Sequence, residues 1–123
     1  MNETNILIDT NIVLYYLHWN STIFDFMRNY WIIVSVITEI ELLSYNKIRD
    51  DELVFLKKVI NTFEVEPLSD DIIQTSIELR RKYWLKIPDA IIAATALVNK
   101  VPLLTADKQL FGIWEIDIIQ FTL

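Results

Sequence analysis

The stretch Ile6-Leu7-Ile8-Asp9-Thr10-Asn11 lies near the start of the chain and changes abruptly from apolar residues to a carboxylate. A short apolar run ended by Asp-Thr-Asn is typical of a buried strand that delivers an acid to the rim of a sheet. Apolar residues between Ile12 and Leu17 then follow at helical spacing. We therefore expect Asp9 to lie at a turn between a strand and a helix.

The same alternation of strand and helix continues to the end of the chain. Further strands are predicted at residues 31–34, 63–66, 101–105 and 115–121. The helices between them are predicted to begin near Ser21, at Ser35 or Thr38, at Asp50, at Ser69 and near Ala90. Because parallel strands need crossover connections, this order predicts an α/β fold with three α/β/α layers and a central parallel sheet of four or five strands.

Two of these helices carry more detailed predictions. The helix that begins at Ser69 ends in Arg80-Arg81-Lys82, which suits the negative end of a helix dipole. Its inward side chains are expected to be Ile72, Ile73, Ile77 and Leu79. The helix over residues 90–97 is rich in small side chains, so we expect it to pack closely under the sheet.

The composition indicates one compact domain over residues 1–123. Hydrophobic residues make up 53% of the chain, and one Gly and three Pro leave little room for linkers. The longest apolar or small-residue stretch, Ala90 to Val98, is much shorter than the roughly 20 residues that cross a bilayer. Glu3 stands where a secretory signal would carry a basic residue. We expect a cytoplasmic protein with no membrane partner.

Several function classes are excluded by residue counts. The absence of cysteine excludes disulfides, thiolate metal sites and cysteine catalysis. A single glycine excludes both the G-x-G-x-x-G dinucleotide loop and the Walker phosphate loop. A formal charge of -6 argues against binding nucleic acid by bulk electrostatics, but an acidic nucleic-acid enzyme fits if cations neutralise its site.

Three aspartates are expected at the same rim of the sheet. Asp9 and Asp107 follow strands and Asp89 begins a helix, and ligands of such sheets bind outside the carboxyl ends of the strands. Taken singly, Asp9 could be a turn or cap residue, Asp89 the N-cap of the alanine-rich helix and Asp107 a loop acid. Taken together, like charges about 4 Å apart repel by roughly 4 kcal/mol at an effective dielectric of 20, so such a cluster raises its own pKa values or binds a cation.

The ligand type indicates which cation would bind. Carboxylate oxygens without Cys or His clusters suit Mg²⁺ or Mn²⁺ better than Zn²⁺. The lone His18 lies near a predicted helix end and is expected to be a surface or packing residue.

Four blocks of the sequence resemble the motif blocks of the PIN-domain family, in the family's order and spread over nearly the whole chain. They are Ile8-Asp9-Thr10-Asn11, Val34-Ser35-Val36-Ile37-Thr38-Glu39-Ile40-Glu41-Leu42-Leu43, Pro88-Asp89-Ala90-Ile91-Ile92-Ala93-Ala94-Thr95-Ala96 and Leu104-Thr105-Ala106-Asp107. The length resembles that of compact VapC-type toxins. The resemblance implies an endoribonuclease that depends on Mg²⁺ or Mn²⁺ and holds one or two ions with Asp9, Glu41, Asp89 and Asp107. Thr105 matches the polar position before the last acid, and Asn11 the polar position after the first.

The glutamate of this set has two candidates. Glu39 and Glu41 are two residues apart, so on a helix they diverge by about 200° and cannot both face the site. The apolar positions around them do not choose between the two. The family pattern places its glutamate three residues after the threonine and directly before leucine, which selects Glu41 and keeps Glu39 as the alternative. Thr38-x-x-Glu41 also fits a capping box, which is the structural alternative.

The resemblance also implies partners. Relatives of this size form homodimers and are restrained by a small antitoxin whose segment fills the acidic groove, so we expect an RNA substrate, a second copy and an antitoxin. Basic residues before Asp89 are candidates to line the RNA path, with an aromatic ring stacking on an unpaired base. They are Arg80, Arg81, Lys82 and Lys86, with Tyr83 or Trp84 as the ring. The alternative is a solvated helix end with aromatic packing, which is favoured for the aromatic residues. The rival functions are a non-catalytic PIN-like binding or regulatory module and a hydrolase of small phosphate esters.

Overall fold

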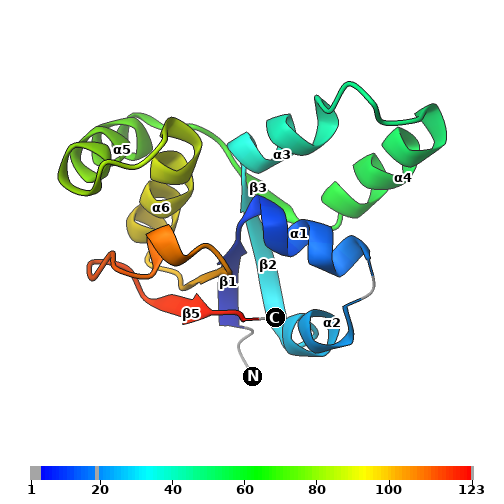
Figure 1. The fold of residues 1–123 in the computed structure, drawn as a ribbon, viewed down its shortest axis with the longest axis horizontal. Coiled ribbons are helices and arrows are strands. Elements are labelled where there is room, and N and C mark those ends of the chain that lie inside the picture. The colour runs from blue at the N-terminus through cyan, green and yellow to red at the C-terminus, as the bar shows by residue number, and fades with distance from the viewer. Residues whose placement is uncertain (1–3, 19, 123) are drawn as a thin grey trace.

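The computed structural model describes residues 4–18 and 20–122 and contains a five-stranded parallel sheet with helices on both faces (Figure 1). The strands are β1 (Thr4–Ile8), β2 (Tyr30–Ser35), β3 (Glu64–Glu66), β4 (Leu103–Thr105) and β5 (Ile118–Gln120). The helices are α1 (Thr10–Leu17), α2 (Ser21–Met27), α3 (Val36–Leu43), α4 (Asp50–Ile60), α5 (Asp70–Tyr83), α6 (Ile87–Asn99) and the short 3₁₀ helix η1 (Lys108–Leu110). The predicted α/β architecture is confirmed.

The order of strands in the sheet is β3-β2-β1-β4-β5, which makes β1 the central strand. All four strand pairs are parallel, so the carboxyl ends of the strands meet at one edge. Leu7 pairs with Leu103 and Ile8 with Leu104. This register brings Asp9 and Thr105, the next residue of each segment, to the same edge of the sheet.

Alternate side chains of the strands enter two separate cores. Leu7 and Leu103 point into the core under α5 and α6, whereas Ile6 and Ile8 point into the core under α1, α2 and α4. Because both faces of the sheet are covered, the sequences of the inner strands are continuous apolar runs and do not alternate between apolar and polar residues. Figure 1 shows these helical layers on either side of the sheet.

Helix α6 is buried over seven consecutive residues, Ala90 to Ala96. Its alanines let α5 and the sheet approach closely, and Leu79 of α5 lies in the same core. Lys100 ends the helix in the left-handed conformation, with its backbone N–H donating to Ala96 and Leu97 carbonyls. The expected close packing of this small-residue helix is confirmed, and it gives the first turn of α6 a rigid support.

Helix starts were predicted with mixed success. The Ser69 hydroxyl accepts from the Ile72 N–H at 3.2 Å, as expected for the start of α5. The cap of α2 is Asn20 rather than Ser21, because the Asn20 side chain accepts from the Ile23 N–H at 3.0 Å. Ser35, not Thr38, caps α3.

Two inward positions predicted for α5 are wrong. Ile72 and Leu79 are buried, but Ile73 and Ile77 are 37% and 48% exposed. Helix α5 contacts α6 through a narrow face that also contains the buried Ser76, so the neighbouring isoleucines face outward. Within the described residues, no helix is long and apolar enough to cross a membrane.

Candidate active site

Asp9 follows the central strand and caps helix α1. Its Oδ1 accepts from the Ile12 N–H at 2.9 Å, and its Oδ2 accepts from the Thr105 hydroxyl. The side chain is only 5% exposed. Burial raises the pKa of Asp9, the two hydrogen bonds oppose that rise, and the charges of Asp107 and Asp89 add to it. Asp9 is therefore both a helix cap and a buried acid next to other acids.

Thr105 and Asp107 reach the same place from the end of β4. The Thr105 hydroxyl is fully buried, and besides donating to Asp9 it accepts from the Asp107 N–H at 3.0 Å. The Asp107 carboxylate accepts from the Gln109 N–H at 2.9 Å and thereby caps η1. Thr105 thus connects the first and last acids of the predicted set.

Asp89 lies in the first turn of α6, after Pro88. Its expected structural alternative, the N-cap of this helix, is wrong, because the helix starts two residues earlier and Lys86 is its N-cap. Burial raises the pKa of Asp89, the charges of Asp107 and Glu41 raise it further, and Lys86 lowers it. Asp89 is thus an electrostatic neighbour of Asp107 and Glu41.

Glu41 is brought to the site by Thr10. The Thr10 hydroxyl donates to Glu41 Oε1 at 2.7 Å and lies 3.0 Å from the Thr38 hydroxyl. The capping-box alternative for Glu41 is wrong, because Ser35 caps α3 and the Glu41 carboxylate contacts α1 instead. Glu39 lies in the first turn of α3, and its charge contributes to neither of the raised aspartate pKa values.

Hydrogen bonds and electrostatic interactions therefore connect Asp9, Glu41, Asp89, Asp107 and Thr105, the acids and the hydroxyl that the sequence placed in the site. Thr10 and Thr38 are additional members that sequence reasoning did not place in the site; it offered Thr38 only as a helix start and as part of a capping box. Their signal was present, because Thr10 directly follows Asp9, and Thr38 precedes Glu41 by three residues on one face of a helix.

The donor set decides which cation could bind here. The site offers carboxylate and hydroxyl oxygens only, which fits a hard cation such as Mg²⁺ or Mn²⁺. Burial raises the pKa values of Asp9 and Asp89, and repulsion from the neighbouring acids adds to that rise; a bound cation would relieve the repulsion. In the described part of the chain, no three acidic or imidazole side chains are already close enough together to form a complete metal site.

The basic residues before Asp89 divide into two groups. Lys82 Nζ lies 3.0 Å from a Glu115 carboxylate oxygen, and the Tyr83 hydroxyl donates to the other oxygen. Lys82 Nζ also lies over the Trp114 ring, 5.0 Å from the ring centroid. This cluster joins the end of α5 to the loop before β5. Lys82 and Tyr83 are therefore engaged in a structural contact.

The other basic residues remain at the surface. Arg80 and Arg81 border a hollow of about 470 Å³ beside Trp84, a residue that is 91% exposed. Lys86 is the basic residue whose charge acts on Asp89. His18 is exposed, with Nδ1 2.7 Å from the Leu14 carbonyl oxygen, as expected for a surface residue.

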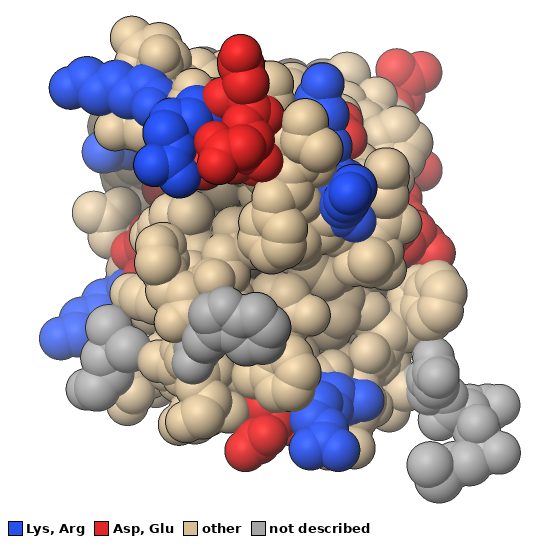
Figure 2. Space-filling model, turned by 90° about the vertical axis from the view of Figure 1, so that its right-hand side faces the viewer, with Lys and Arg blue, Asp and Glu red and all other residues tan. Residues whose placement is uncertain are grey.

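A cleft of about 670 Å³ opens next to Glu41, between α1, α3 and α4. Apolar side chains line most of it, among them Leu14, Leu42 and Phe55, and Thr10 and Glu41 lie in its wall. Figure 2 looks onto the side of the molecule that carries α4 and shows a largely uncharged surface with many of the charged side chains near its upper edge.

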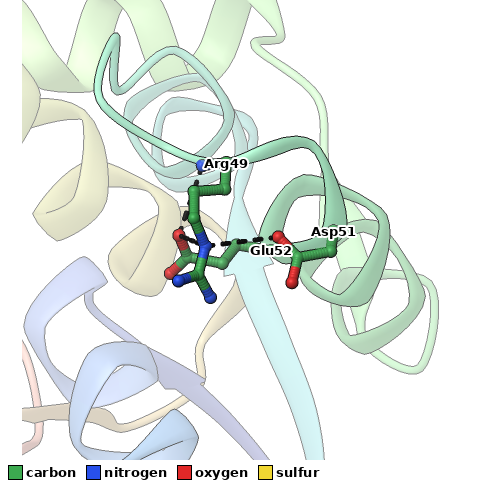
Figure 3. A network of polar contacts seen from close by, with 3 residues as sticks. All are labelled: Arg49, Asp51 and Glu52. Atoms are coloured by element: carbon green, nitrogen blue, oxygen red, sulfur yellow. Dashed lines mark hydrogen bonds and ion pairs between the residues drawn. The ribbon is translucent and has the colours of Figure 1, made fainter.

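The start of α4 carries a small polar network beside this cleft. Arg49 Nε lies 3.3 Å from an Asp51 oxygen and 3.1 Å from a Glu52 oxygen, and the Arg49 N–H donates to Glu52 at 3.2 Å (Figure 3). Asp51 and Glu52 also line the cleft, together with Glu41 and one basic residue, Lys47.

Comparison with known protein families and structures agrees with the family that the four motif blocks indicated. The family model described as PIN domain matches residues 6–113. A chain of a toxin-antitoxin complex from Klebsiella pneumoniae is 28% identical, with a TM-score of 0.83 over 94% of this chain and 97% of that chain. No curated protein matches.

Two more distant structures share the fold. A chain of VapBC2 from Rickettsia felis, bound to a promoter DNA fragment, is 21% identical with a TM-score of 0.82, covering 97% of this chain and 100% of that chain. A chain of DNA-bound VapBC from Salmonella typhimurium is 17% identical with a TM-score of 0.84, covering 95% and 98%. With 108 consecutive residues matched by the family model and the same fold in these structures, the chain belongs to the PIN-domain family.

Proposed function

We propose that this protein is a VapC-type toxin, an endoribonuclease that depends on Mg²⁺ or Mn²⁺ and hydrolyses RNA phosphodiesters. The observation that carries the proposal is the assembly of Asp9, Glu41, Asp89 and Asp107 at the carboxyl edge of a parallel sheet in a PIN-family chain. Solved toxin-antitoxin chains with the same fold support it.

The acidic residues share the binding of the cation in the proposed mechanism. Asp9, Asp89 and Asp107 would hold the cation, with Glu41 binding it directly or through water. When bound, the cation supplies positive charge that activates a water and stabilises the departing oxygen of an in-line phosphodiester hydrolysis. Thr105 orients the Asp9 carboxylate, and the buried setting of Asp9 keeps its oxygens fixed.

The remaining residues shape the access of RNA. Lys86 is suited to a phosphate next to the acids, because its charge already acts on Asp89. Arg80, Arg81 and Trp84 offer further phosphate and stacking contacts beyond it. Lys82 and Tyr83 are assigned instead to the Glu115 contact.

The experiment is cleavage of a structured RNA by the purified protein, with Mn²⁺ or with a chelator, followed by mapping of the cut sites. We expect Mn²⁺-dependent cleavage that Asp9→Asn reduces at least about 100-fold, since the substitution removes a ligand rather than an outer contact. Asp117→Asn is the control, because this exposed aspartate lies before β5, at the opposite end of the strands.

The rival functions give different outcomes. If the unchanged protein and Asp9→Asn are equally inert while both are folded, and calorimetry detects no metal binding, the chain is a binding module. Hydrolysis of a small phosphate ester without RNA cleavage identifies an ester hydrolase instead.

An antitoxin is proposed as the partner that restrains the site. The cleft beside Glu41 is lined mostly by apolar side chains, with three acidic residues and one lysine among them, which suits a segment with apolar and basic side chains. The net charge of -6 favours the same partner. Co-purification with the small protein encoded by a neighbouring reading frame tests this. Phe55→Ala should weaken the complex, whereas Val54→Ala should not, because Val54 is equally exposed but does not line the cleft.

A homodimer in the cytoplasm is proposed as the working form. Isoleucines on three helices, Ile40, Ile77 and Ile87, are 48–58% exposed and would be covered by a second copy. Sedimentation should show a dimer that Ile77→Lys converts to a monomer. Glu78→Lys, on the exposed neighbouring position, should leave the dimer intact, and a monomeric unchanged protein contradicts the proposal.

A further inference from the structure

Two threonine hydroxyls hold Glu41 in a defined direction. The Thr10 hydroxyl lies 2.7 Å from Glu41 Oε1 and 3.0 Å from the Thr38 hydroxyl oxygen. A hydroxyl has one hydrogen, and a carboxylate can only accept. Because the Thr10 hydrogen is donated to Glu41, the Thr38 hydroxyl must be the donor to Thr10. The three side chains form a chain of hydrogen bonds with one possible direction.

The burial of its members shows which end of this chain is fixed. Thr38 is 1% exposed, Thr10 is half-buried and Glu41 is exposed. An exposed glutamate samples many rotamers, whereas a buried threonine on a helix does not. The buried Thr38 therefore restrains Thr10, and Thr10 in turn restrains the exposed carboxylate of Glu41.

We infer that Thr10 and Thr38 are positioning residues, which preset the Glu41 carboxylate for the cation of the neighbouring aspartates. This inference rests on the proposed function, because it assumes that the acids bind a divalent cation. Thr10 also directly follows Asp9, so the same helix start places the first acid and the hydroxyl that orients the glutamate. The arrangement is an outer shell of the kind that supports metal ligands in other proteins.

The test is the affinity of the folded protein for Mn²⁺, measured by titration calorimetry, with thermal unfolding as a check of the fold. Loss of an outer-shell hydrogen bond weakens metal binding about 10- to 100-fold, so we expect Thr10→Val to weaken Mn²⁺ binding about 10-fold. Thr10→Ser keeps the hydroxyl and should restore affinity to within about threefold of the unchanged protein. Thr22→Val, an exposed threonine at the start of α2, is the matched control and should change nothing.

A double substitution separates positioning from general loss of stability. If Thr10 acts through Glu41, then Thr10→Val should weaken Mn²⁺ binding no further in a Glu41→Gln background. Equal affinity of Thr10→Val and the unchanged protein overturns the positioning role and leaves the nuclease proposal standing. An undiminished effect of Thr10→Val in the Glu41→Gln background overturns it as well. Failure of the unchanged protein to bind Mn²⁺ overturns the proposed function and this inference together.

Discussion

The substitution Asp9→Asn should change the thermal stability of the protein in opposite directions with and without metal. In a chelator, the fold buries the Asp9 carboxyl group beside two other acids, and burial raises its pKa, so the folded state disfavours the charged form. Asparagine carries no charge and keeps one oxygen to accept from the Ile12 N–H, whereas its amide NH₂ replaces the oxygen that accepts from Thr105 and can only donate to that hydroxyl. Because the removed charge outweighs this change of one hydrogen bond, the variant should unfold at a higher temperature than the unchanged protein. With Mn²⁺ the order should reverse, because only the unchanged protein retains the complete ligand set.

The size of the metal effect follows from linkage and chain length. A ligand present at 100 times its Kd stabilises the folded state by about 2.7 kcal/mol. An unfolding entropy of about 2.1 cal/mol/K per residue corresponds to about 0.26 kcal/mol/K for a chain of 123 residues. Saturating Mn²⁺ should therefore raise the Tm of the unchanged protein by about 10 °C.

The assay is thermal unfolding followed by circular dichroism, at a series of Mn²⁺ concentrations and in chelator, on the unchanged protein, Asp9→Asn and the control Asp117→Asn. The control should follow the unchanged protein under every condition. The reasoning is refuted if Mn²⁺ raises the Tm of Asp9→Asn as much as that of the unchanged protein. If Asp9→Asn has a lower Tm than the unchanged protein in chelator, the prediction that the buried charge of Asp9 destabilises the metal-free fold is refuted.

Three further predictions concern the glutamate, the pH dependence and a helix cap. Glu41→Gln should weaken Mn²⁺ binding in calorimetry by about tenfold or more, whereas Glu39→Gln should leave it unchanged; the reverse result would assign the role to Glu39. In chelator, denaturant unfolding should show stability falling as pH rises from 3.8 through the raised folded pKa values of Asp9 and Asp89, because the folded state binds more protons than the unfolded state in that window. The difference between Asp9→Asn and the unchanged protein should shrink toward pH 3.8, and a constant difference would contradict this assignment. Ser69→Ala should lower the stability by about 1 kcal/mol, or about 4 °C in Tm, without changing Mn²⁺ affinity, and an unchanged Tm would show that this cap contributes nothing.

The sheet and the aspartates were predictable because each depends on a local pattern. An apolar run ending in Asp9 identifies the central strand, and parallel strands bring their carboxyl ends to one edge. Asp107 was predicted on the same grounds. The start of α6 was placed late, because Pro88 and Asp89 together resemble a cap, although Pro is also favoured in the first turn of a helix.

The choice between Glu39 and Glu41 could not be made from periodicity. Both positions lie at the border of the apolar face of α3, and what distinguishes them is a hydroxyl that lies 31 residues earlier in the chain. The exposure of Ile73 and Ile77 could not be predicted from the sequence either. Apolar spacing shows which side chains could be buried, but it does not show how wide the packed face of the helix is. Contacts between distant segments thus decided the details that local patterns left open.

The hydrogen bond from Thr105 to Asp9 joins residues that are 96 positions apart in the chain. During synthesis the first acid leaves the ribosome long before its partners, and Asp89, Thr105 and Asp107 all belong to the last third of the sequence. A nascent chain shorter than about 105 residues lacks β4, one of the two strands that pair with β1, and such distant pairing is slow to form even when both segments are present. If the protein is a ribonuclease, its order of synthesis delays assembly of the acidic site until β4 and Asp107 have been synthesised.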